Sequence, residues 1–147
     1  MELIEAVSRV DAIKPNGFTR GEKIKWLSVL DGVIKQEIID THEGAEAIEF
    51  NGYDEETSVQ TVLLVPHPYD ILYLRWLEMQ IDYANGEYGK YNNSREMYNS
   101  AYSDYERYYN RTHMPKGKKF KYFGQDQSKS PMYEASNAVA KVTIEED

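Results

Sequence analysis

Three histidines, His42, His67 and His113, are the side chains of this sequence best suited to metal binding or proton transfer. Each is predicted to lie in a loop or at the boundary of a helix. A metal site usually draws its ligands from positions at helical or short-loop spacing. Only His42 lies in a mixed cluster, with Asp40 and Glu43, and these two acids belong to a longer acidic run. We interpret this cluster as a solvated helix end, and we expect neither a metal site nor a cofactor.

Motifs for catalysis are absent from the sequence. There is no G-x-S-x-G elbow, no phosphate-binding glycine loop, no H-E-x-x-H and no dinucleotide fingerprint. Carboxylates are plentiful, but none lies in an apolar run that would raise its pKa for acid–base work. The chain has no cysteine, which excludes disulfides, thiolate nucleophiles and Cys-ligated metals. We therefore expect no catalytic residues and a protein that is not an enzyme.

Charge is distributed unevenly along the chain. The net charge is −8, with 25 Asp and Glu against 17 Lys and Arg, which argues against a protein that coats nucleic acid. Residues 37–56 carry eight acids and no Lys or Arg, whereas residues 111–121 carry five bases and no acid. Local contacts with partners of either charge therefore remain open.

Tyrosines at helical spacing make one candidate surface for binding other proteins. They fall in a helix predicted over residues 94–111 and in the turn before it. One interpretation is a core face whose hydroxyls reach the edge, and the other is a contact between subunits, where Tyr is enriched. The side chains concerned are Tyr88, Tyr91, Tyr98, Tyr102, Tyr105 and Tyr109.

A second candidate segment, residues 116–123, alternates lysine with glycine and aromatic residues. It is open to three interpretations: a solvated charge run, a docking segment for an acidic partner with aromatic anchors, or an arm that binds nucleic acid. The side chains that would make these contacts are Lys118, Lys119, Phe120, Tyr122 and Phe123.

The hydrophobic pattern predicts the helices that would position these residues. Leu3, Val7 and Val10 share one face of a short first helix. Thr19 and Glu22 match a capping box at the start of a second helix over residues 20–40. Its apolar face is widened by three side chains, so we expect this helix to pack on two sides. These are Trp26, Val29 and Val33.

The third helix is predicted to start after the arm with Pro68 near its first turn, and the fourth to be capped by Asn93 and Glu96. Between the second and third helices, residues 59–65 form an apolar extended arm that needs a helix or another chain to lie against. The sequence thus predicts a mainly α, four-helix bundle-like domain over residues 1–113, with this short extended or β arm. Residues 114–147 are expected to form an extended C-terminal tail.

Neither a secretory signal nor an apolar run of membrane-spanning length is found in the sequence. We therefore expect no membrane association and a cytoplasm-like compartment.

Several short stretches resemble a family of small proteins from tailed phages and prophages of Gram-positive bacteria. The resemblance covers most of residues 1–116 and fades in the tail. The stretches that carry it are residues 38–44, 64–73, 76–83, 85–88, 90–94 and 111–116, among them the sequence Leu64-Val65-Pro66-His67-Pro68-Tyr69-Asp70.

This resemblance implies a head–tail connector, or neck adaptor, in which small helical bundles form a ring, commonly of twelve copies, beneath the portal. The expected partners are further copies of the chain, the portal protein and the next neck or tail-completion protein. DNA would pass through the ring without specific binding. The expected location is the neck of the virion, and the host cytoplasm during assembly.

The expected exposure of side chains and the architecture of this family together suggest two groups of contact residues. For contacts within the ring we expect Tyr88, Tyr91, Tyr98, Tyr105, Val62, Leu63 and Leu64. For the portal or an adjacent ring we expect Lys118, Lys119, Phe120, Tyr122 and Phe123. The alternatives are another phage assembly protein, such as a tail-completion or head accessory factor, and a small intracellular DNA-binding regulator.

Overall fold

The structure, a computed structural model, describes residues 1–117. The chain divides into two compact units, Met1–Pro115 and Lys116–Asp147, of which the first is described in full. Within residues 1–117 there are four α-helices and no strand longer than an isolated bridge, so the predicted mainly α fold is confirmed. The helices are α1 (Leu3–Ile13), α2 (Arg20–Ile34), α3 (Ile71–Ala84) and α4 (Tyr88–Thr112).

The first helix and the start of the second lie where the sequence predicts them. The α1 helix buries Leu3, Val7 and Val10 on one face. At the start of α2, Thr19 Oγ1 accepts a hydrogen bond from the Glu22 N–H, and the Glu22 carboxylate accepts one from the Thr19 N–H. This reciprocal capping satisfies backbone donors that a helix start leaves without partners.

The second helical segment extends to residue 39, but its last turn widens into a π-helix, Lys35–Ile39. A short 3-10 helix, Ala45–Ala47, follows after Gly44, whose φ of 86° places it in the left-handed region that favours glycine. The chain then runs without regular structure to α3. The peptide bond between His67 and Pro68 is cis.

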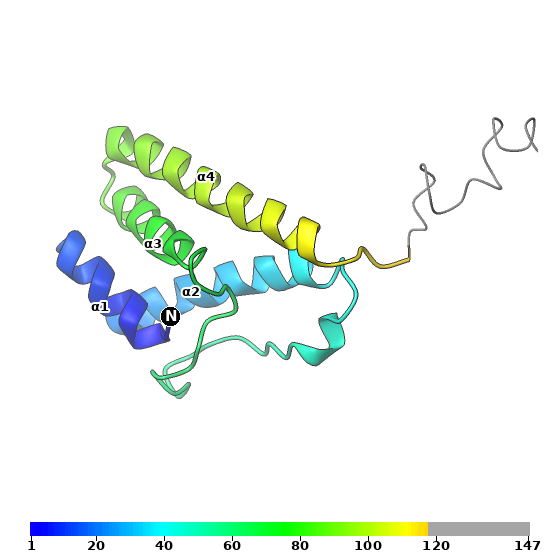
Figure 1. The fold of residues 1–147 in the computed structure, drawn as a ribbon. Helices are drawn as coiled ribbons and strands as arrows, with labels where there is room; N and C mark the ends of the chain where they lie inside the picture. Colours follow the sequence, from blue (N-terminus) through cyan, green and yellow to red (C-terminus); the bar gives the residue numbers. More distant parts are fainter. Residues whose placement is uncertain (118–147) are drawn as a thin grey trace, which may run out of the picture. The chain divides into compact units, whose positions relative to one another are not determined.

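The α3 and α4 helices form an antiparallel pair joined by a tight turn at residues 85–87, with α2 and α1 on the other side of α3 (Figure 1). One predicted helix start is wrong, because α4 begins at Tyr88 rather than near Asn93. The α3 helix begins at Ile71, directly after a turn that contains Pro68. Gly89 and Asn93 lie inside α4 because packing of this helix on α3 outweighs their weak local helix preference.

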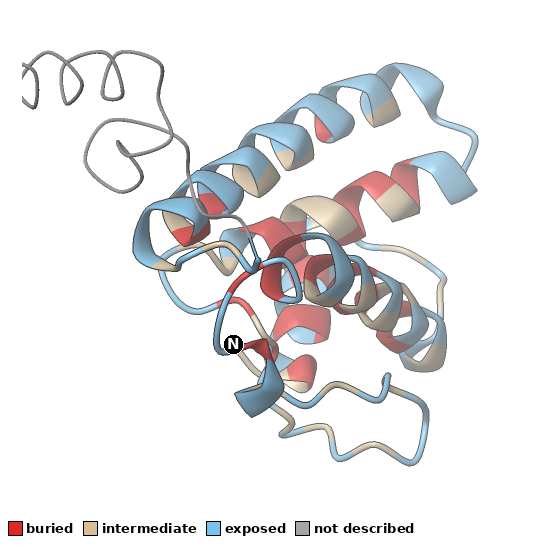
Figure 2. Cartoon of the chain, turned by 90° about the vertical axis from the view of Figure 1, so that its right-hand side faces the viewer, coloured by how far each residue is buried: buried red, intermediate tan, exposed pale blue. Residues whose placement is uncertain are grey.

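The core lies where α3 meets the other three helices. Figure 2 shows buried residues on the facing sides of the helices and exposed residues along the outer side of α4. The burial of this apolar surface is the main stabilising contribution to the fold. The largest fully buried side chains are Leu3, Leu27, Leu30, Ile34, Ile38, Ile39, Leu72, Tyr73, Leu74, Leu77, Ile81 and Tyr105.

Candidate interaction surface

The arm, residues 59–65, lies against the N-terminus of its own chain. The backbone N–H of Leu3 donates to the Thr61 carbonyl (3.0 Å), and the N–H of Leu63 donates to the Met1 carbonyl (3.0 Å). Leu63 and Val65 are buried in the core, while Val62 points outward with 66% of its surface exposed. Of the three arm residues expected in ring contacts, Val62 is therefore presented on the surface, Leu64 is half-buried and Leu63 is enclosed by its own domain.

A buried carboxylate on α2 fixes the end of this arm. Asp31 is fully buried and accepts hydrogen bonds from the Tyr53 hydroxyl (2.6 Å) and the Tyr73 hydroxyl (2.6 Å). It also accepts one from the N–H of Leu64 (3.2 Å). The N–H of Val65 donates to Tyr73 Oη (2.8 Å), so the two tyrosines, Asp31 and the arm form one network, here called the Asp31 cluster.

Burial changes the protonation equilibria of the Asp31 cluster. Removal from water disfavours the charged carboxylate and raises the pKa of Asp31, although the three hydrogen bonds that it accepts act in the opposite direction. The same burial, together with the neighbouring charge of Asp31, raises the pKa of Tyr73 and of Tyr53. The hydrogen bonds of the Asp31 cluster hold the arm in place. The side chains of Asp31 and Tyr73 are buried, and that of Tyr53 is half-buried.

The tyrosines of α4 divide between the core and the surface. Tyr105 and Tyr109 are buried. Burial is the main reason that the pKa of Tyr105 is raised. Tyr98 and Tyr102 are half-buried, and burial raises the pKa of Tyr98 to about 12. The core interpretation is therefore confirmed for Tyr105 and Tyr109, and of the expected ring contacts Tyr105 has its side chain inside the core.

Half-buried and exposed aromatic side chains continue along one side of α3 and α4, forming what we call the aromatic stripe. The rings of Trp76 and Tyr98 are 5.1 Å apart, and those of Tyr83 and Tyr91 are 5.4 Å apart. The Arg95 guanidinium lies over the Tyr91 ring at 5.8 Å, within cation–π range. The members of the stripe are Trp76, Tyr83, Tyr91, Arg95, Tyr98 and Tyr102.

The α2 helix borders this stripe and leaves apolar side chains uncovered beside it. Trp76 Nε1 donates to the Trp26 carbonyl (2.8 Å), which joins α3 to α2. Val29 and Val33 follow Trp26 by three and seven residues on the same helical face. Val29 is 57% exposed and Val33 is 36% exposed, so the expectation that this helix packs on two sides is wrong. Within residues 1–117, nothing covers its second apolar face.

Beside the stripe begins the acidic segment, residues 37–56. All eight of its carboxylates are exposed. Asp40 pairs with Lys35, and Glu37 accepts a hydrogen bond from the Tyr102 hydroxyl (3.1 Å). The other 17 acids of the chain equal its 17 bases, so the net charge of −8 equals the charge of this segment. The acidic run found in the sequence at residues 37–56 is therefore exposed on the surface of the domain.

Two of the three histidines meet where α4 ends. His42 is buried, its Nδ1 lies 2.6 Å from the Ile38 carbonyl, and its ring meets that of Tyr109 edge-on at 4.9 Å. The His113 ring stacks on Tyr109 at 3.8 Å. His42 is thus packed in the domain, contrary to the expected solvated helix end. Among residues 1–117, no group of three His, Asp or Glu side chains is arranged to hold a metal ion.

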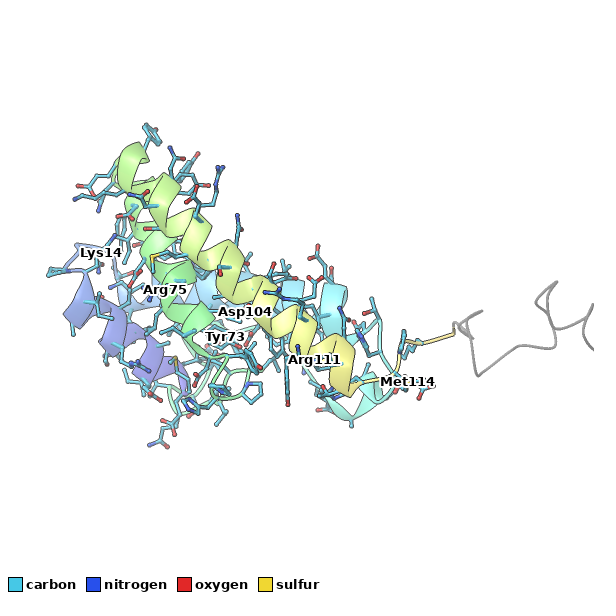
Figure 3. The ribbon with its side chains drawn as sticks, turned by 45° about the horizontal axis from the view of Figure 1, so that its top comes forward. Lys14, Tyr73, Arg75, Asp104, Arg111 and Met114 are labelled. Carbon is cyan, nitrogen blue, oxygen red and sulfur yellow. The ribbon has the colours of Figure 1, made fainter. Side chains whose placement is uncertain are left out.

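The chain leaves the domain beside this histidine pair. The N–H of Glu43 donates to the Met114 carbonyl (2.7 Å), and His42 and Pro115 form an isolated antiparallel bridge. Figure 3 shows Met114 directly after α4, at the end of the bundle far from Lys14. The expected portal contacts in the tail lie outside the described residues. They are Lys118, Lys119, Phe120, Tyr122 and Phe123.

No protein-family model matches the chain, and no curated protein and no solved structure is significantly similar to it. No helix within residues 1–117 is long and apolar enough to cross a membrane. The site therefore has to be judged from its own residues. The sequence indicates the tyrosines, Val62 and the widened apolar face of α2, but it does not indicate Arg95. The exposure of Val29 and Val33 is not predicted, because this face was expected to be covered.

Proposed function

We propose that this chain is a structural subunit of a virion neck, a head–tail connector that forms a ring under the portal and surrounds the DNA passage. The observation that best supports this proposal is an exposed aromatic and apolar surface together with a separate exposed valine on one small domain. One is the aromatic stripe with the uncovered side of α2, and the other is Val62 on the arm. Contacts between unlike surfaces of identical copies generate rings when the rotation closes.

The acidic segment supports the second part of the proposal, the lining of a DNA passage. A surface of exposed carboxylates repels the phosphates of a duplex, so DNA slides past it without being held. Replacing Glu43, Glu49 and Glu56 with Gln in phage particles is expected to slow DNA exit, measured as the rate of genome release. An unchanged rate would contradict this role. The same exchange at Glu87, Glu96 and Glu106, outside the segment, is the matched control.

Deletion of the gene from its parent phage or prophage tests the connector role, with lysates viewed by electron microscopy. Filled or leaking heads beside finished, unattached tails are the expected result, reversed by supplying the wild-type chain. Infectious, intact particles would contradict the proposal. Empty or misshapen heads would instead favour a head accessory factor, and heads with incomplete tails would favour a tail-completion factor.

The regulator alternative predicts a different property of the purified protein. Binding to duplex DNA would weaken steeply with salt, and the slope would fall when the lysines of residues 116–121 are neutralised. A connector is expected to show no such binding at physiological salt.

A further inference from the structure

Val62 is presented next to a carboxylate. The hydrogen bonds from Leu3 to Thr61 and from Leu63 to Met1 flank the antiparallel pair of Glu2 and Val62. In such a non-hydrogen-bonded pair the two side chains lie close together on the same side of the backbone. Val62 of the arm, which is exposed, and Glu2 of the N-terminus, which is half-buried, therefore lie side by side.

The aromatic stripe offers the opposite charge beside apolar rings. Arg95 is exposed and contacts the Tyr91 ring, and Tyr83 beside that ring is 58% exposed. Within residues 1–117, neither Arg95 nor Glu2 takes part in an ion pair. Trp, Tyr and Arg are the side chains that most often dominate the binding energy of protein interfaces. The stripe thus has the composition of a binding surface and a free charge for one partner group.

We propose that a second copy of this chain covers the stripe, with its Val62 on the rings around Tyr91 and its Glu2 paired with Arg95. This pairing rests on the proposed ring and specifies which two surfaces meet in it. The two surfaces are unlike, and each copy carries both, so the contact is heterologous and can be repeated from copy to copy. The complementary charges fix the register of the contact more than they add to its affinity.

Disulfide trapping tests the contact directly, because the natural chain has no cysteine. One preparation carries Val62→Cys and another carries Tyr91→Cys, and the two are mixed under mild oxidation. The mixture is expected to give a disulfide-linked pair with roughly tenfold higher yield than Val62→Cys mixed with Ser103→Cys. Ser103 is exposed on the outer side of α4, which makes it a matched control.

The yields separate the possible arrangements. Equal yields with Tyr91→Cys and Ser103→Cys would overturn the proposal, and so would a mixture in which Val62→Cys links mainly to itself. Native mass spectrometry of the unmodified full chain distinguishes failure of the proposed pairing from failure of the proposed ring. Closed oligomers without the expected link would overturn the pairing and leave the proposed ring standing, whereas a monomer without the link would remove both.

A charge exchange tests the ion pair itself. Arg95→Glu is expected to weaken self-association about tenfold, and Glu2→Arg is expected to do the same. The double exchange should restore association, because the pair is re-formed with reversed signs. The matched control is Arg20→Glu, which makes the same charge change at an exposed residue in the first turn of α2. This variant should leave self-association unchanged. Failure of the double exchange to restore association would overturn the pairing.

Discussion

Asp31 binds the end of the arm through hydrogen bonds. Its carboxylate is fully buried and accepts hydrogen bonds from two tyrosines and from the arm backbone. Such a group is costly to bury unless all of its partners are in place. We infer that the Asp31 cluster holds Val62 in a fixed place on the surface, and two predictions follow at the scale of single residues.

Removal of the Tyr73 hydroxyl should destabilise the domain more than removal of the Tyr53 hydroxyl. Tyr73→Phe removes a donor to Asp31 and the acceptor of the Val65 N–H, both buried, which should cost about 2–3 kcal/mol of unfolding free energy. Tyr53→Phe removes one hydrogen bond at a half-buried ring and should cost about 1 kcal/mol. Urea denaturation of the two variants measures both values, and a larger loss for Tyr53→Phe would be inconsistent with this account.

The raised pKa of Asp31 predicts the sign of a pH effect. A carboxyl whose folded-state pKa lies above its unfolded value stabilises the fold fully below the unfolded value of 3.8 and loses that contribution as pH rises through the folded value. The unfolding free energy of the wild type minus that of Asp31→Asn should therefore fall as pH rises from about 3.8. Denaturation over a pH series measures this difference, and a rise with pH would refute the assigned shift.

At the scale of the elements, three helices are tied together by one buried carboxylate on α3. Asp82 accepts a hydrogen bond from Lys14, at the end of α1 (2.5 Å), and one from Ser94, in α4 (2.5 Å). Asp82 is fully buried, and the exposed fraction of the Lys14 side chain is 27%. The Ser94 hydrogen bond is one of the contacts by which α4 packs on α3.

Lys14→Ala is expected to lower the unfolding free energy by about 2 kcal/mol, because it leaves the Asp82 carboxylate buried with one partner. Lys90→Ala is the matched control, since its ion pair with Glu87 is exposed and should contribute less than about 0.5 kcal/mol. Chemical denaturation compares the two. Equal losses of unfolding free energy in the two variants would show that the burial of Asp82 does not make its ion pair with Lys14 more stabilising than an exposed one.

The sequence predicts elements whose causes are local and misses those whose causes are distant. The capping box of Thr19 and the apolar face of α1 are visible within a few residues, and both predictions are confirmed. The start of α4 was misplaced because Asn93 resembles a cap, while packing on α3 decides the conformation. The hydrogen bonds to Asp31 join residues 22 to 42 positions apart, and no local pattern reveals them.

At the scale of the whole molecule, the described domain separates its surface by chemistry. The acidic segment carries the net charge, the aromatic stripe carries exposed rings, and the arm carries Val62. Electrostatic repulsion makes a contact between two acidic segments unfavourable, so copies should meet through their apolar surfaces. In such an arrangement the acidic segments stay outside the contacts between copies.

The central claim is most directly tested by a cryo-electron microscopy reconstruction of the neck in particles of the parent phage or prophage. The expected result is a closed ring of this helical domain between capsid and tail. Residues 37–56 should face the channel, and Val62 of each copy should lie on the aromatic stripe of the next copy. Particles whose neck lacks this domain, or a ring with residues 37–56 on its outer surface, would contradict it.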